Sequence, residues 1–265
     1  MTPSILVLAN QADAAEPTAR CAAALGGELP AHLVLLHLDM YPVILDPEMM
    51  MAATEQTTRQ EAATMADLHE LAQRLPVPAN VIEAAGLMGE AVAAVLRQQN
   101  PLLLAMGLQA EHNLLDGLLL NQVLPVLRET HRPLLLVPKA AAAAAGPPRR
   151  VVLALDGEPF LLNAAALALA PLLASWPAAY TVAHVATDPT PTAGSASATS
   201  PARRALADAR ACGVLQALTD MRADVLVLLV RPRSWLSGLF HRSVTVAVLR
   251  HCHVPVLLLS AEALN

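Results

Sequence analysis

The sequence predicts an α/β protein made of two doubly wound parallel-sheet domains, the second of them abbreviated. Three observations favour this fold class. Short aliphatic runs alternate with Ala-rich helical stretches, which is typical of βαβ units. The aliphatic runs are continuous rather than alternating with polar residues, as in strands buried on both faces of a parallel sheet. Finally, one helix–turn–strand pattern occurs twice, once near the middle of the chain and once near its end.

In the first half, every expected strand is a short Leu/Val/Ile-rich run. We expect strands at residues 5–8, 33–38, 78–84, 102–106 and 133–137. The expected helices are residues 16–25, 54–74, 89–99 and 121–130, the first of them ended by Gly26-Gly27. These elements predict a first domain over residues 1–138.

A polyalanine run closed by Gly-Pro-Pro follows, in "KAAAAAAGPPRR". Because the prolines stop a helix from continuing, residues 139–149 are predicted to be a linker. The pattern then restarts over residues 150–261. Here we expect strands at 151–155, 180–186 and 225–230, and helices at 161–175 and 202–221.

The internal match is strongest at the ends of the two halves. "VLRETHRPLLLVP" closes the first half and "VLRHCHVPVLLLS" closes the second. Arg128 matches Arg250 and Pro133 matches Pro255 at the same sequence offset, which indicates a duplication. The low-complexity stretch 187–201 is followed by a single helix, and no run resembles the strand expected at 78–84. The second domain is therefore expected to lack its third strand and part of the preceding helix.

The composition argues against several classes of protein. The net charge of −5 and the pI near 6.0 give no general attraction to nucleic acid or anionic membrane. The three cysteines are far apart and lack CxxC spacing, so neither a disulfide framework nor a zinc ribbon is expected. Because no signal peptide or long apolar span is evident, we expect a cytoplasmic protein. Charged residues make up only 15% of the chain, which suggests self-association.

These features together resemble a tandem form of the universal stress protein family. The resemblance rests on the "ILVL" and "VVLALD" opening strands and on the repeated "VLRxxxxP" ends, and it covers nearly the whole chain. It implies five-stranded parallel sheets that pair through their last strands, here within one chain as a pseudo-dimer. Further association into a homodimer is also expected.

Some members of this family bind ATP, and the resemblance implies where such a site would lie. Binders carry G-x-x-G after the fourth strand and, about nine residues later, Gly-[Ser/Thr] at a helix N-terminus, where glycines let N–H groups reach phosphates. In the first half Gly107 keeps the first glycine position, and Ala110 replaces the second. Leu120-Asn121 replaces Gly-Ser, and Asn10 stands where an acidic residue follows the first strand.

The second half departs from the same motif in a different way. Asp156 keeps the acidic position, whereas Val230 and Arg233 replace the loop glycines. Arg242-Ser243 replaces Gly-Ser, with the hydroxyl in its expected place. The candidate ligand-binding residues are Asp156, Arg231, Arg233, His241, Arg242 and Ser243 in the second half, with Asn10, Gly107 and Asn121 in the first.

Two interpretations of the basic residues stay open. Three arginines at a helix N-terminus are suited to binding a phosphate or carboxylate. The other interpretation is a solvated loop, which is the usual setting of such a charge run. Asp156 likewise suits either ribose binding or a simple turn. No nucleophile–base pair, P-loop or metal-ligand set is evident, and His251-Cys252-His253 does not have metal-ligand geometry on a helix.

The sequence thus predicts a non-enzymatic, stress-associated regulatory or interaction protein that has largely lost ATP binding and needs no cofactor. Its expected partners are itself and other proteins. The alternative is a sensor that binds a nucleotide such as ATP or AMP, or another small anion, in the second domain.

Overall fold

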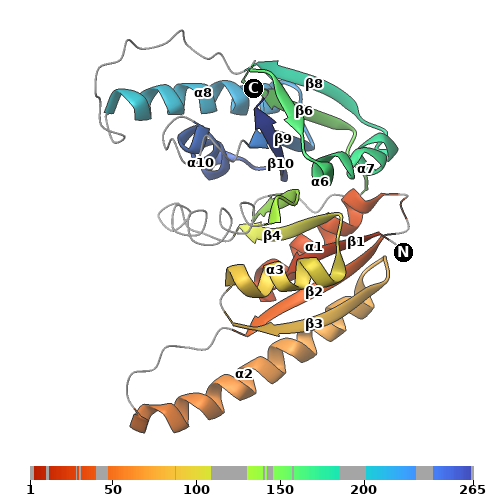
Figure 1. Ribbon diagram of the computed structural model, residues 1–265, viewed down its shortest axis with the longest axis vertical. Coiled ribbons are helices and arrows are strands. Elements are labelled where there is room, and N and C mark those ends of the chain that lie inside the picture. The colour runs from red at the N-terminus through yellow and green to blue at the C-terminus, as the bar shows by residue number, and fades with distance from the viewer. Residues whose placement is uncertain are drawn as a thin grey trace.

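The computed structural model describes residues 3–9, 12–27, 29, 31–39, 47–86, 88–108, 130–139, 141, 146–156, 158–184, 201–230 and 241–263. Within these ranges the chain forms a ten-stranded sheet with helices on both faces (Figure 1). Most neighbouring strands are parallel. The predicted α/β class with a mostly parallel sheet is therefore confirmed.

The first-half elements that the structure describes occur in the predicted order, although the first two helices begin four and seven residues earlier than expected. The strands are β1 (Ser4–Leu8), β2 (His32–Asp39), β3 (Ala79–Ala85), β4 (Leu103–Leu108) and β5 (Leu134–Pro138), and the helices are α1 (Ala12–Gly26), α2 (Pro47–Arg74) and α3 (Met88–Gln99). α1 ends as expected, because Gly27 adopts φ +57° and so supplies the left-handed residue that commonly follows a helix. The helix expected at 121–130 lies outside the described residues except for Thr130.

The described part of the second half contains five strands and four helices. Its strands are β6 (Arg150–Leu155), β7 (Phe160–Leu162), β8 (Ala179–His184), β9 (Val225–Val230) and β10 (Val256–Ala263), and its helices are α6 (Ala164–Leu167), α7 (Ala170–Ser175), α8 (Pro201–Asp220) and α10 (His241–His251).

The prediction of a single helix at 161–175 is wrong, because this segment forms a strand and two short helices. β7 pairs with the far end of β10, and this pairing holds residues 160–162 extended. Asn163 then caps α6, its side-chain oxygen accepting a hydrogen bond from the Ala166 amide at 2.8 Å. Pro171, in the first turn of α7, has no N–H to continue the preceding helix.

The order of the strands is β3-β2-β1-β4-β5-β10-β9-β6-β8. Outward from β5 the sheet contains the fourth, first, second and third strands of the first half. Outward from β10 it contains β9, β6 and β8, and the described residues include no counterpart of β3. β5 and β10 join the two halves antiparallel, with Leu135 opposite Leu257.

Two apolar cores cover the two faces of the sheet, and each contains residues from both halves. One lies beneath α3, α8 and α10 and includes Val92, Val214 and Val248. The other lies beneath α1, α2, α6 and α7 and includes Ala19, Leu68 and Leu172. Because neither core stops at the β5–β10 boundary, the halves share their buried surface.

The second core also contains a polar link between the halves. Trp176 follows α7 and is 5% exposed. Its indole N–H donates a 2.8 Å hydrogen bond to the carbonyl oxygen of Leu25 in α1. The short helices of the second half are thus fixed to the first helix of the first half.

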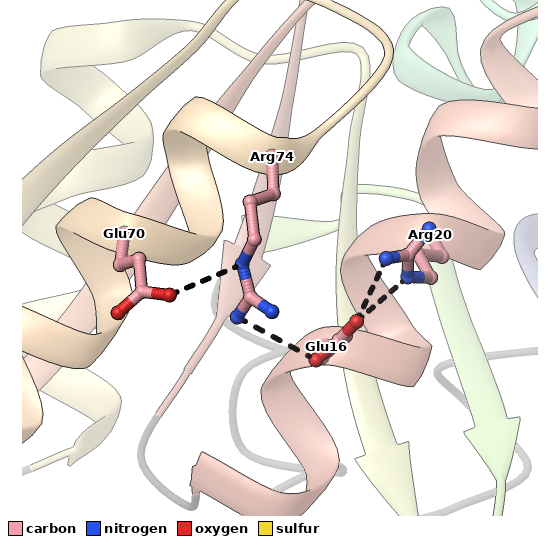
Figure 2. Close-up of polar contacts among 4 residues, drawn as sticks. All are labelled: Glu16, Arg20, Glu70 and Arg74. Carbon is pink, nitrogen blue, oxygen red and sulfur yellow. Dashed lines mark hydrogen bonds and ion pairs between the residues drawn. The ribbon is translucent and has the colours of Figure 1, made fainter.

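On the first half, α1 and α2 are joined at the surface by charged side chains (Figure 2). Glu16 of α1 lies between Arg20 on its own helix, at 2.8 Å, and Arg74 of α2, at 3.8 Å. Arg74 also contacts Glu70 at 3.7 Å. All four side chains are substantially exposed, so this chain of ion pairs orients the helices without stabilising them strongly.

Candidate functional site

The predicted second-half site lies at the carboxyl ends of β6 and β9. These strands are parallel neighbours, with Ala154 opposite Leu228. Asp156 directly follows β6, and Val230 is the last residue of β9, so continuing the register places them at the same edge of the sheet. This edge, outside the carboxyl ends of parallel strands, is where open α/β sheets bind ligands.

The first turn of α10 belongs to the same edge. α10 connects β9 to β10, which are parallel, so the helix must begin near the carboxyl end of β9. His241, Arg242 and Ser243 are its first three residues. The topology therefore brings them to the edge occupied by Asp156. Their side chains, and all of Arg231 and Arg233, lie outside the described residues.

Asp156 itself forms a turn. Its Oδ1 accepts a hydrogen bond from the backbone N–H of Glu158 at 3.1 Å, the pattern by which Asp side chains stabilise loops after strands. This contact favours the local structural role that the sequence left open, since it occupies one of the carboxylate oxygens.

The strand register corrects the alignment of the first loop glycine in the second half. Leu104 of β4 lies opposite the first residue of β5, and Leu226 of β9 lies opposite the first residue of β10. Three residues further along each strand, Gly107 therefore corresponds to Leu229, and the expected match at Val230 is wrong by one residue. Leu229 is partly buried against the second core. A glycine there would leave the backbone open to a phosphate, whereas leucine adds apolar packing near the end of β9.

The first-half counterpart keeps its glycine. Gly107 lies within β4, opposite Val137 of β5. Asn10 and Asn121, the other predicted residues of this site, lie outside the described residues. Gly107 is therefore the one first-half candidate whose position is known, and it is at the carboxyl end of its strand as predicted.

Two of the three cysteines, Cys21 and Cys252, have buried thiols. Burial raises the pKa of Cys21 to about 12 and that of Cys252 to about 11, so both stay protonated and unreactive. The Cys252 thiol donates to the carbonyl oxygen of Val254 at 3.3 Å. Among the described side chains, no group of three or more His, Cys, Asp or Glu residues is arranged to hold a metal ion.

Sequence reasoning missed one polar group, which lies in the first half beneath α2. His37 and Asp39 of β2, Glu83 of β3 and Glu61 of α2 form this group, called here the carboxyl cluster. The alternation His37-x-Asp39 at the end of an otherwise aliphatic strand is the sequence pattern by which it could have been found.

Comparisons with known proteins agree with the fold. The model of the universal stress protein family matches residues 213–260, which run from the second half of α8 through most of β10. A search of the curated proteins finds no match.

Solved structures resemble the whole chain. A universal stress protein from Archaeoglobus fulgidus is 16% identical with a TM-score of 0.60, over 97% of this chain and 96% of that one. A putative universal stress protein from Pseudomonas aeruginosa is 18% identical with a TM-score of 0.57, over 98% and 94%. A functionally unknown protein from the same species is 16% identical with a TM-score of 0.55, over 98% and 92%. At such identities the likeness shows a shared α/β fold. None of the described helices is long and apolar enough to cross a membrane.

Proposed function

We propose that this chain is a tandem universal stress protein, with two domains joined as a pseudo-dimer, that acts as a non-enzymatic regulatory or interaction protein after losing most of its ATP binding. The family match over residues 213–260 and the full-length structural likenesses support the family assignment. The antiparallel β5–β10 pairing and the similar strand order on its two sides support the tandem arrangement.

A further likeness between the halves supports duplication. Asn100 and Arg222 both adopt a left-handed backbone, with φ of 43° and 48°. Each lies three residues before its half's fourth strand, β4 or β9. Such residues are uncommon outside glycine, so the same conformation at the same place argues for a common origin of the two turns.

The Leu229 side chain is the observation that carries the proposed loss of ATP binding. It has the place in β9 that Gly107 has in β4, and it packs against the second core. The sequence departures at Ala110, Arg233 and Arg242 act in the same direction, since each removes backbone freedom or space where phosphates would lie. The turn formed by Asp156 completes a loop stabilised by its own contacts.

Titration calorimetry of the full chain with ATP, AMP and inorganic phosphate tests this function. We expect no heat of binding from any of the three, and a mass spectrum of protein purified without added nucleotide should show no bound ligand. Saturable ATP binding would contradict the proposed loss.

The alternative is a sensor of a nucleotide or small anion in the second domain, favoured by the basic first turn of α10 on the edge that also holds Asp156. If ATP binds, the variants Asp156→Ala and Ser243→Ala decide between the domains. Loss of binding in both would establish the sensor. Unchanged binding in both, with loss in Asn121→Ala, would place the ligand in the first domain.

A further inference from the structure

The carboxyl cluster lies where α2 crosses the end of the sheet. His37 is directly opposite Glu83 in the β2–β3 register, and Asp39 is two residues further along β2. Side chains two residues apart in a strand share a face, so these three groups lie on one face of the sheet. Leu33 and Leu35 of β2 extend the same face into the core beneath α1 and α2.

Glu61 approaches this face from α2. The helix packs on the second core through Leu68, Leu71 and Leu75, and Met65 is partly buried against it. Glu61 is one turn before Met65, on the side that these residues define. Its side chain is hydrogen-bonded to Asp39 and close enough to His37 and Glu83 to be influenced by their charges.

The lengths of the elements place Glu61 at the point where α2 leaves the sheet. From Arg74 back to Glu61 the helix covers about 20 Å, which is about the length of β2 between Leu33 and Asp39. The helix then continues for about four more turns, residues 47–60. Figure 1 shows this part of α2 projecting beyond the strands.

A hydrogen bond between two carboxyl groups requires a proton on one of them, because ionised carboxylates can only accept. The pKa of Glu61 is raised above its ordinary value, first by burial, then by the hydrogen bond with Asp39 and by the negative charges of Asp39 and Glu83. His37 acts in the opposite direction, but the net effect is still to raise the pKa of Glu61.

A buried imidazole is independent evidence that the carboxyl cluster includes a polar group without its full set of hydrogen bonds. His37 is 7% exposed, and its Nδ1 is buried without a hydrogen-bond partner. Two nearby cations are already paired, because Arg20 and Arg74 bind Glu16 or Glu70. Arg59, two residues from Glu61 on α2, has an exposed side chain. α3, which carries Glu90 and Arg97, packs on the opposite face of the sheet.

We infer that Glu61 and Asp39 share a proton and so form a pH-dependent clasp that holds α2 against the carboxyl end of β2. Loss of the proton leaves two carboxylates facing each other, with Glu83 adding a third negative charge. The contact then becomes repulsive, and the projecting part of α2 loses this attachment to the sheet. This device is independent of the proposed nucleotide site.

The direction of the pH effect follows from the raised pKa. An acid whose pKa is higher in the folded state binds its proton more tightly there. Its contribution to the stability of the clasp is therefore complete when the pH is at or below the ordinary pKa. The contribution is lost as pH rises through the raised value. The opening equilibrium of the clasp should increase by about tenfold for each unit by which the pKa is raised.

Hydrogen exchange of the full chain, corrected for intrinsic exchange rates, tests the clasp between about pH 4.5 and about pH 8. In the wild type, amides around Glu61 should lose protection as pH rises. In Glu61→Gln this dependence should disappear, because the carboxamide donates to Asp39 at every pH. Asp67→Asn, at an exposed position of the same helix, serves as the control and should behave as the wild type.

Two results would overturn the inference: protection in the wild type that does not change with pH, or the same pH dependence in wild type and Glu61→Gln. A second measurement needs no variant. Carboxyl-carbon NMR of the wild type should show Glu61 titrating at higher pH than it does in the unfolded chain, and titration at the same pH would equally exclude a shared proton.

Discussion

β2 and β8 are the second strands of the two halves, and they differ in what covers them. Each pairs in parallel with the first strand of its half. Leu35 of β2 lies opposite the fourth residue of β1, and Val182 of β8 lies opposite the fourth residue of β6. Although their positions match, Leu35 is fully buried and Val182 is 48% exposed. Leu33 and Tyr180, one pleat earlier, differ in the same way, with 1% and 50% exposure.

The cause lies in the neighbours rather than in the strands. β2 is flanked by β3 and covered by α2, whereas the described residues include no equivalent of either beside β8. The described part of the second half has other contacts instead: the Trp176 bond to α1, the β7–β10 pairing and a carboxylate clamp at Asp224. The first of these contacts reaches the longer half, so the comparison teaches that the shorter half relies on the longer one for part of its packing.

The largest expected effect tests that dependence at Trp176. Trp176→Ala removes a buried ring between α7 and α1 and its hydrogen bond to Leu25, so it should lower the free energy of unfolding by about 3–5 kcal/mol. Trp176→Phe keeps most of the packing and should cost clearly less. Chemical denaturation of the three proteins measures the difference; equal stability of Trp176→Ala and wild type would show that the halves do not rely on this contact.

The next prediction compares the two strands directly. Leu35→Ala should destabilise the fold by about 2–5 kcal/mol, because it leaves a cavity in the second core. Val182→Ala, at the matching place in β8, should change stability by no more than about 0.5 kcal/mol, since the side chain is half exposed. Thermal unfolding of both variants checks the contrast. Similar losses in the two would mean that β8 is covered in solution.

The sequence predicts the buried strands well and the second-half helix poorly, for different physical reasons. Runs such as "LLLAMG" and "VLVLLV" are apolar on both faces, which only central parallel strands require. The run "FLLNAAALALAPLLAS" is also apolar throughout, and its local pattern suits one helix. What divides it is the capping by Asn163, the break at Pro171 and the pairing of β7 with β10. The last of these is a contact about 100 residues away in the chain.

The location of the candidate site could be predicted from the sequence, whereas the contacts within it could not. The strand–helix alternation places Asp156 and the start of α10 at one edge of the sheet, and the structure agrees. The turn made by Asp156 and the packing of Leu229 depend on contacts that the motif does not describe. The carboxyl cluster was missed because its members come from three elements, and only the folded register sets His37 opposite Glu83.

A smaller effect is expected at Asp224, which links two strands of the second half. Its Oδ2 accepts hydrogen bonds from the backbone N–H groups of Arg149 and Arg150, both at 2.9 Å, and so ties the start of β9 to the start of β6. Asp224→Ala should cost about 1 kcal/mol, because the two bonds are charge-assisted but partly exposed to solvent. Urea denaturation measures it. The Arg150→Ala variant removes only the side-chain contact and serves as the control.

The smallest expected effect belongs to the first half, at the ion pairs of Figure 2. Arg74→Gln removes the contacts with Glu16 and Glu70 while keeping a long polar side chain on α2. Because all these groups are solvated, the loss should be at most about 1 kcal/mol and should vanish in high salt, where exposed charges are screened. Thermal unfolding at low and high ionic strength measures both the loss of stability and its dependence on salt. A loss that persists in high salt would mean that Arg74 packs α2 against α1 through its aliphatic stem, and that the cover over β2 rests on this residue as well as on Leu68 and Leu71.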